Sequence, residues 1–151
     1  MPVADRWFER KRISDDITLL WEPHVVPLMR CNIWHVRGRD RDLMIDTGMG
    51  VASLRDAARD ILGHNVTAVA THTHADHIGG HHEFDHTLVH AAEAENLRVP
   101  ADRSTLRLSQ MPSHYVESLT RAGYVVDRDL ITALPHAGYD MDDYAIHDSV
   151  V

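Results

Sequence analysis

Four residues that can bind a metal ion lie within six consecutive positions of this 151-residue chain. They are His72, His74, Asp76 and His77, in the pattern His-x-His-x-Asp-His, and Gly79 and Gly80 follow closely. Imidazole and carboxylate ligands without a thiolate suit Zn²⁺, and they also tolerate iron or manganese. The pattern therefore predicts a metal centre. The alternative is a helix-capping Asp76 among solvated surface histidines.

The segment before the motif indicates how these side chains are positioned. Residues Val66–Thr71 are apolar and β-branched, which is typical of a buried strand. If strand geometry continues, His72 and His74 point to the same side and can share one cation. Asp76 and His77 are adjacent, so they must lie on a turn or a first helical turn that folds back over the first pair. We therefore expect two neighbouring subsites.

The stretch His72–Gly80 resembles the signature of the metallo-β-lactamase fold hydrolases. Further features match in order: Asn32–Val36, then Leu43–Gly48, and Phe84 shortly after the glycines. Over most of residues 7–100 the chain is similar to the branch of lactonase-like, glyoxalase II-like and acyl-CoA thioesterase-like members. The resemblance implies an α/β (α+β) fold, namely the amino-terminal half of an αββα sandwich, with a mixed sheet flanked by helices.

The resemblance also implies a function and a cofactor. It predicts a metal-dependent hydrolase that attacks an ester, thioester or lactone carbonyl with a metal-bound hydroxide, with two Zn²⁺ ions per complete site. Asp76 would be a catalytic residue as well as a ligand, orienting the hydroxide and passing its proton to the leaving group. Asp46 matches a family residue that lies behind the ligands and hydrogen-bonds to them. Its alternative role is to cap a turn or helix.

The expected site is incomplete, because the second half of the family fold supplies a third His for the first metal, a bridging Asp and a last His. We expect residues 1–126 to form the amino-terminal portion and the polar, turn-rich residues 127–151 to form a lid or connecting segment. His136 is a candidate third ligand, although the expected preceding Gly is absent. The alternative function is a non-catalytic half-domain that self-associates as a homo-oligomer or pairs with a missing carboxyl-terminal fragment.

The remaining histidines near the motif and the single cysteine are assigned structural roles. His81, His82, His86 and His90 would overfill two subsites as ligands, so we expect exposed side chains on helix surfaces or strand edges. One cysteine excludes an internal disulfide, and Cys31 is predicted to be a buried, reduced thiol at the start of a strand.

Composition limits the partners. The chain has 15 Lys and Arg against 23 Asp and Glu, a formal charge of -8, which disfavours nucleic acid as a partner. The family resemblance implies a small acyl-type substrate instead. No apolar run approaches the ~18 residues of a membrane span, and the first residues lack the apolar core of a signal peptide. We therefore expect no membrane association and a cytoplasmic setting. The basic Arg10–Arg12 is interpreted as a solvated turn.

Hydrophobic patterning predicts the elements around the motif. Three strands, Ile17–Trp21, Asn32–Val36 and Asp42–Ile45, are expected to form an antiparallel meander. An amphipathic helix over Val51–Leu62, closed by Gly63, is expected before the motif, and a strand at Thr87–His90 with helices at Ala91–Leu97 and Ser113–Arg121 after it. Without a second half, the inner apolar face that includes Ile33, Leu43, Ile45 and Val69 would need a cover.

Overall fold

The computed structural model describes residues 4–25, 27–98 and 113–121. The predicted lid or connecting segment, residues 127–151, lies outside the described residues, and so does His136. The domain boundary at residue 126 is therefore untested. Among the helices in the described part of the chain, none has the length and apolar character needed to cross a bilayer.

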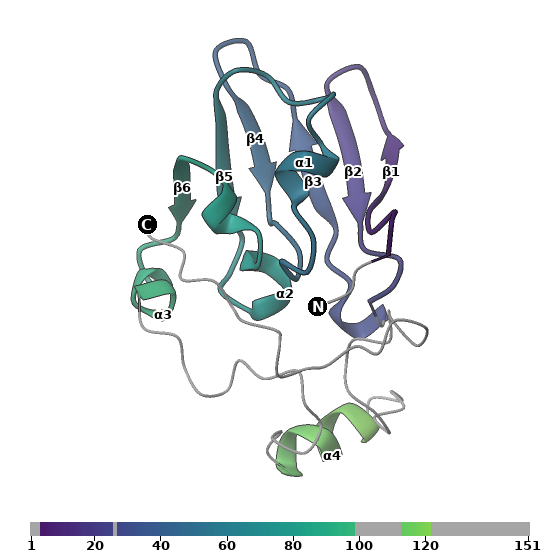
Figure 1. Ribbon diagram of the computed structural model, residues 1–151. Helices are drawn as coiled ribbons and strands as arrows, with labels where there is room; N and C mark the ends of the chain where they lie inside the picture. The colour runs from purple at the N-terminus through teal and green to yellow at the C-terminus, as the bar shows by residue number, and fades with distance from the viewer. Residues whose placement is uncertain (1–3, 26, 99–112, 122–151) are drawn as a thin grey trace.

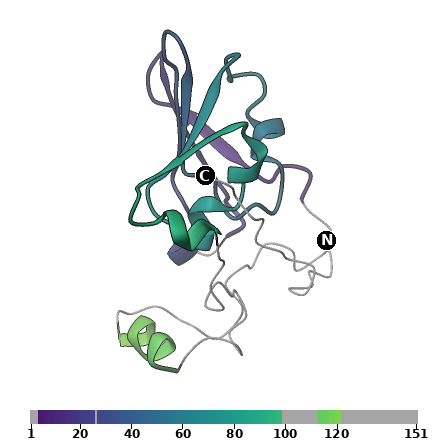
Figure 2. The same cartoon turned by 90° about the vertical axis from the view of Figure 1, so that its left-hand side faces the viewer.

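A single six-stranded mixed sheet organises the described residues, with its strands in sequence order from β1 to β6 (Figure 1). The first four strands are antiparallel, and β4, β5 and β6 run parallel. The predicted meander of the second to fourth strands is confirmed. The strands are β1 Glu9–Arg12, β2 Ile17–Trp21, β3 Ile33–Val36, β4 Asp42–Ile45, β5 Val66–Ala70 and β6 His86–Val89. Figure 2 views this sheet from its β6 side.

The basic residues Arg10–Arg12 belong to the edge strand β1, so their interpretation as a turn was wrong. Arg10 donates two hydrogen bonds to the Asp60 carboxylate, at 2.6 and 2.7 Å, and this contact lies fifty residues away in the sequence. Charged side chains on an edge strand discourage pairing with another chain. The strand therefore carries charge where the local pattern suggested a loop.

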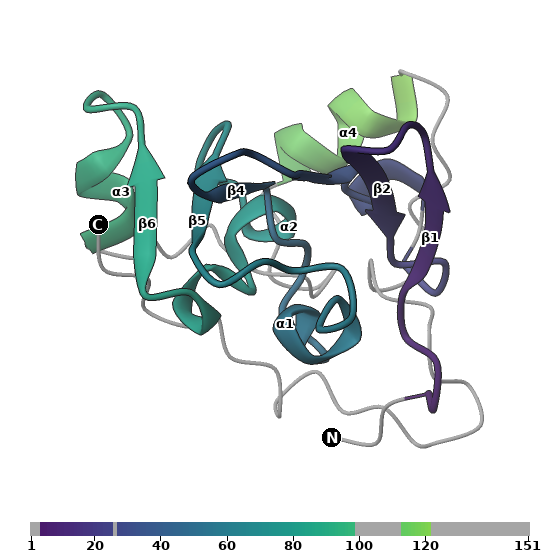
Figure 3. The same ribbon diagram turned by 90° about the horizontal axis from the view of Figure 1, so that it is seen from above.

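One face of the sheet forms the core. Leu20, Ile33, Met44 and Ala68 are fully or almost fully buried on this face, and Leu54 of the short helix α1 (Leu54–Ala57) packs against it. Figure 3 shows α1 on this side of the sheet. Ile33 therefore does not belong to the face that was expected to need a cover. Its neighbour across the strands is the buried Leu20.

The other face carries an apolar row that crosses five strands. Pairing aligns Leu19, Trp34, Ile45, Val69 and Leu88 as successive cross-strand neighbours, so their side chains share one face. The first four are half-buried, whereas Leu88 is 55% exposed. This open face lies opposite the core.

The helix predicted over Val51–Leu62 is much shorter. Ser53 is extended and caps the helix through its side chain, which accepts a hydrogen bond from Asp56 N, and Glu83 accepts the free N–H groups of Leu54 and Arg55. After residue 57 the chain continues as turns. Gly63 does not cap a helix, because its N–H donates to Asp42 Oδ2 at 2.8 Å. Contacts with Glu83 and Asp42, which are distant in the sequence, therefore influence this segment in a way that hydrophobic periodicity could not show.

The remaining helices are short. α2 Ala75–Ile78 lies at the carboxyl ends of β4 and β5 (Figure 1), and α3 Ala94–Arg98 follows β6. α4 Ser113–Arg121 has the predicted bounds. Two 3-10 turns, η1 Pro27–Met29 and η2 His81–Glu83, complete the set. Leu97 of α3, Ile78 of α2 and Ala70 of β5 form a small apolar cluster behind the motif.

Candidate metal centre

The motif lies where β5 ends and α2 begins. The strand stops at Ala70, so His72 and His74 lie on a connecting loop, with His74 at the N-cap of α2. The expectation that strand alternation aligns these two rings was wrong. A turn brings them together instead, and their ring centroids are 4.5 Å apart.

His72 occupies the middle of a three-histidine cluster. Its ring centroid lies 4.0 Å from that of His77 and 4.5 Å from that of His74. Burial lowers the pKa of His72, and the neighbouring His77 and His74 lower it further. A neutral imidazole is the form that binds a metal. The electrostatic surroundings of His72 therefore suit a ligand.

Thr73, between the two loop histidines, is tied to Glu93 just before α3. Its backbone N–H and its hydroxyl both donate to Glu93 Oε2. His72 and His74 therefore flank a residue that makes two hydrogen bonds to Glu93. These bonds restrict the conformation of the loop and leave both imidazoles unused.

Asp76 and His77 lie in the first turn of α2, as their adjacency predicted. Asp76 Oδ2 and His77 Nε2 are 3.3 Å apart. Two ligands at about 2.0–2.2 Å from a tetrahedral zinc ion lie about 3.4 Å from each other. The 3.3 Å separation is close to this value, and it is also that of an ion pair between Asp76 and a protonated His77. The Asp76 side chain is only 10% exposed and that of His77 only 21%.

Asp46 holds the other side of the His77 ring. Its Oδ2 lies 2.8 Å from His77 Nδ1, and its carboxylate also accepts the backbone N–H and the hydroxyl of Thr71 at 2.7 and 2.8 Å. A carboxylate on one imidazole nitrogen fixes the tautomer and leaves the other nitrogen free to bind a metal. The expected hydrogen bond between Asp46 and a motif histidine is therefore present.

The same contacts determine the charge of His77. Burial opposes a positive ring, but the hydrogen bonds that His77 makes with Asp46, Asp76 and Cys31 outweigh this effect and raise the pKa of His77. Burial acts to raise the pKa of Asp46, and its bonds to His77 and Thr71 reverse that effect, so the pKa is lowered. A cation bound at Nε2 must therefore displace a proton from His77.

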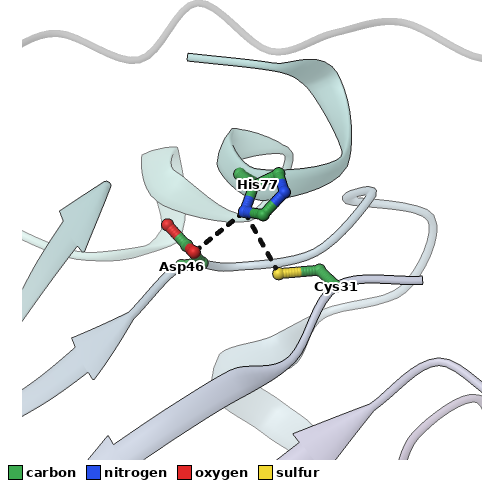
Figure 4. Close-up of side chains that lie close together, drawn as sticks. All are labelled: Cys31, Asp46 and His77. Carbon is green, nitrogen blue, oxygen red and sulfur yellow. Dashed lines mark hydrogen bonds and ion pairs between the residues drawn. The ribbon is translucent and has the colours of Figure 1, made fainter. Parts of the chain in front are cut away.

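Cys31 contributes an unexpected neighbour (Figure 4). It is buried as predicted, and its Sγ lies 3.5 Å from His77 Nδ1. The ligand-type atoms of Cys31, Asp46 and His77 all lie within 4.8 Å of one another. Cys31 precedes β3 and Asp46 follows β4. Because these two strands are antiparallel neighbours, the start of β3 and the end of β4 lie at the same end of the sheet. Strand order alone could have revealed this proximity.

Two sets of residues could hold a cation together with His77, and each set would use a different ring nitrogen. One set is Cys31 and Asp46, and the other is Asp76. A cation among Cys31, Asp46 and His77 would use Nδ1, which is already engaged by Asp46. A cation held with Asp76 would use Nε2 and leave that hydrogen bond intact. Burial is the largest effect on the Cys31 thiol and raises its pKa, so the thiol is a poor source of thiolate. The geometry favours Asp76 as the partner of His77.

His81 is not the exposed residue that we predicted. It is fully buried, and neither ring nitrogen has a hydrogen-bond partner in the described part of the chain. Burial lowers its pKa, and the nearby Leu88 backbone partly offsets this without reaching hydrogen-bond geometry. The other three histidines near the motif, His82, His86 and His90, are exposed as expected.

A separate cavity of about 280 Å³ lies away from the motif. Arg55, Arg59, His64 and His86 are among its lining residues, at the amino-terminal ends of β5 and β6, and none of the four motif residues lines it. The candidate metal centre therefore lies outside this cavity, at the carboxyl end of β5.

Comparison with known proteins decides the family. The model of the metallo-beta-lactamase superfamily matches residues 26–143. This chain belongs to the metallo-beta-lactamase superfamily. The predicted resemblance is confirmed, and membership implies a site for a divalent metal.

The chain is also similar to curated relatives over part of their length. Acyl-coenzyme A thioesterase MBLAC2 from Homo sapiens is 41% identical over 106 residues, which cover 62% of this chain and 38% of that protein. The Bos taurus protein of the same name is 44% identical over 106 residues, with the same coverage. The chain thus spans well under half the length of the curated relatives it matches. This partial coverage fits an amino-terminal half.

Solved structures confirm the fold. MEM-A1, a subclass B3 metallo-beta-lactamase from a soil metagenome library, superimposes with a TM-score of 0.52 at 15% identity, covering 69% of this chain and 41% of that chain. A metallo-beta-lactamase from Cronobacter sakazakii gives 0.51 at 12% identity, covering 70% and 42%. The predicted α/β fold with a mixed sheet and helices is therefore confirmed.

Proposed function

We propose that this chain carries the amino-terminal half of a metal-dependent hydrolase centre that cleaves an acyl thioester, ester or lactone. The observation that carries the proposal is the geometry of His77, whose Nδ1 is held by Asp46 while its Nε2 lies 3.3 Å from Asp76 Oδ2. Superfamily membership and the thioesterase names of the relatives support the reaction class.

The donor set suits zinc. His72 and His74 would hold the first cation, and Asp76 and His77 the second, so all donors are nitrogen or oxygen. Iron or manganese would also accept such ligands. When bound, the cations supply Lewis acidity and lower the pKa of water, so that hydroxide is available as a nucleophile at neutral pH.

Asp46 and Asp76 would have different roles in the centre. Asp46 keeps the His77 ring in the tautomer that presents Nε2, since its carboxylate accepts at Nδ1. Asp76 has a second carboxylate oxygen, which would orient the nucleophile and move a proton towards the leaving group. Asp76 and His77 are largely buried in α2, which keeps their donor atoms in place.

The site proposed here is incomplete. Two protein donors per cation fall short of the three or four that zinc sites usually have. The resemblance assigns the missing donors to the second half of the fold, and His136 remains a candidate third ligand. We therefore propose that the 151 residues alone bind metal weakly and that further protein groups complete the centre.

Thioester hydrolysis tests the function directly. The zinc-loaded chain would be incubated with a short-chain acyl-CoA, the matching p-nitrophenyl ester and a γ-lactone, and release of thiol, phenolate and acid would be followed. We expect slow, chelator-sensitive turnover that is lost in the His72→Ala/His74→Ala double variant. Turnover that survives both the chelator and the double variant would refute a metal-dependent hydrolase.

A second candidate function, association without catalysis, is favoured by the open apolar face. Leu19, Trp34, Ile45 and Val69 are only half-buried on it, and Leu88 is 55% exposed. At about 25 cal/mol per Å², several hundred Å² of such surface in water would cost on the order of 10 kcal/mol, comparable with the stability of a whole domain. A second copy of the chain could cover this face by symmetry.

Light scattering combined with intact mass spectrometry tests this alternative. Self-association predicts a dimer of the 17.1 kDa chain, and Trp34→Asp should shift it towards monomer. A co-purifying carboxyl-terminal fragment would instead identify the second half as the cover. A compact 17.1 kDa monomer that unfolds cooperatively would contradict both forms of association.

A further inference from the structure

Glu22 is a buried carboxyl group that the roles above do not use. It directly follows β2 and has no exposed surface. Trp7 Nε1 donates to its Oε1 at 2.9 Å, and Met49 N donates to its Oε2 at 3.0 Å. No Lys or Arg in the described ranges forms an ion pair with it. Burial raises its pKa to about 7, although both hydrogen bonds oppose this rise. A buried carboxyl without a cationic partner is costly.

The loop that Glu22 contacts has an unusual backbone. Asp46, Gly48 and Gly50 have φ values of 58°, 72° and 73°, so three of five consecutive residues are left-handed. Met49 lies between the two glycines, and its buried N–H requires an acceptor. Glu22 supplies that acceptor. A Cβ on Gly48 would lie 2.6 Å from Glu22 Oε2, so the carboxyl also packs directly against this backbone.

The other side of the same loop is joined to α2. Thr47 N donates to the His77 carbonyl and Gly79 N donates to the Gly48 carbonyl, both at 2.8 Å. A Cβ on Gly50 would lie 2.4 Å from Gly79 O. The two backbones therefore touch without room for a side chain. A shift of residues 47–50 must move the helix that carries Asp76 and His77.

We propose that Glu22 is a positioning residue for the candidate metal centre: it holds residues 47–50, and these residues hold Asp76 and His77 as paired donors. Glu22 itself contacts neither donor. Its effect passes through the backbone contacts of Met49, Gly48 and Gly79. The expected change in metal affinity rests on the proposed function. The contacts that link Glu22 to α2 are independent of it.

Glu22→Gln is the decisive variant, because the amide keeps the shape of the carboxyl but can accept from only one of the two donors and turns an N–H towards the other. Amide exchange measured by NMR on the chelator-treated chain should be about tenfold faster at Thr47 and Gly79, since a buried hydrogen bond is lost. Co²⁺ affinity should fall about tenfold, the lower end of the range for groups that hold metal ligands.

Asp42→Asn is the matched control. Asp42 is also buried and also accepts a backbone N–H, from Gly63, but it lies at the other end of the sheet. The Asp42→Asn variant should have faster amide exchange at Gly63. Its amide exchange at Gly79 and its Co²⁺ affinity should be unchanged. Equal losses of Co²⁺ affinity in both variants would assign the effect to general destabilisation and overturn the proposal.

Two further outcomes are decisive. A folded Glu22→Gln chain with unaltered Gly79 exchange and unaltered Co²⁺ affinity would overturn the proposal. If that variant does not fold, Trp7→Phe removes one donor and keeps the Met49 bond. A smaller loss of Co²⁺ affinity then supports the role, and an unchanged affinity overturns it. An unaltered chain that binds no Co²⁺ would refute the metal centre itself, and exchange at Gly79 would still decide the role of Glu22.

Discussion

Asp46 and His77 form the contact on which the proposed centre depends. Asp46 Oδ2 lies 2.8 Å from His77 Nδ1, and the two residues are 31 positions apart in the sequence. Because this bond engages one nitrogen, the other nitrogen of the ring is turned towards Asp76. The carboxylate thus selects which atom of His77 can bind a cation.

Asp46→Asn tests this selection. Asparagine tolerates the left-handed φ of 58° at this position, so the backbone should be preserved. Loss of the carboxylate should lower zinc affinity about 10- to 100-fold, as is typical when the partner of a metal-binding imidazole is removed. Chelator competition would measure the affinity. Asp85→Asn, an exposed control, should match the unaltered chain, and equal affinities for all three chains would contradict the role of Asp46.

We predict weak metal binding, because the proposed centre has only two protein donors for each cation. With two donors per cation, zinc should be substoichiometric after purification and should be removed by brief chelator treatment. Metal analysis per chain, measured beside the mass in solution, checks this. A proven monomer that retains two tightly bound metals and turns over acyl-CoA rapidly would show that the site is complete without further residues.

Stability should fall with rising pH because of Glu22. Its folded pKa of about 7 lies above the ordinary 4.5, so the folded chain binds the extra proton between these values. Its contribution is fully present below pH 4.5 and is lost as the pH rises through 7. At about 1.4 kcal/mol per pKa unit, the loss is about 3 kcal/mol of unfolding free energy. Urea unfolding of the chelator-treated chain and of Glu22→Gln from pH 4.5 to 8 measures this loss as the difference between the two chains.

Glu22→Gln should remove the part of that pH dependence that comes from Glu22, since the amide does not titrate. The raised pKa of His77 also lowers the stability as the pH rises above 6.5, and that part should remain in the variant. The groups that act on Glu22 are the donors Trp7 and Met49 and the nearby Asp76 carboxylate, whose charge also raises the pKa of Glu22. An unchanged slope in the variant would place the pH dependence elsewhere.

The sequence predicted those elements whose determinants are local. β2 and β4 have the predicted bounds, because β-branched and apolar runs ended by charged or turn residues define both strands. α4 spans Ser113–Arg121, the residues over which a helix was predicted. In contrast, the start of α1 is capped by Glu83, 29 residues downstream of Leu54, and β1 is joined to Asp60 by Arg10. Periodicity contains no signal for such tertiary contacts.

The candidate site was predictable to a similar extent. Spacing identified the four motif residues, and their clustering follows from one loop and one helical turn. Spacing could not identify Glu22, which reaches the site only through the backbone of residues 47–50. The burial of His81 was also missed, because the turn after Gly80 directs its ring into the interior. The ligand roles of His72, His74, Asp76 and His77 stay predictions, as does the cytoplasmic setting.

X-ray absorption at the zinc edge of the loaded chain tests the central claim most directly. Cys31 Sγ lies 3.5 Å from His77 Nδ1, so a competing site that includes sulfur is within reach of a small movement. Binding by His72, His74, Asp76 and His77 predicts a nitrogen and oxygen shell at about 2.0–2.2 Å with imidazole scattering beyond it. It also predicts an identical spectrum for Cys31→Ala. A zinc–sulfur distance of about 2.3 Å that disappears in Cys31→Ala would contradict the account.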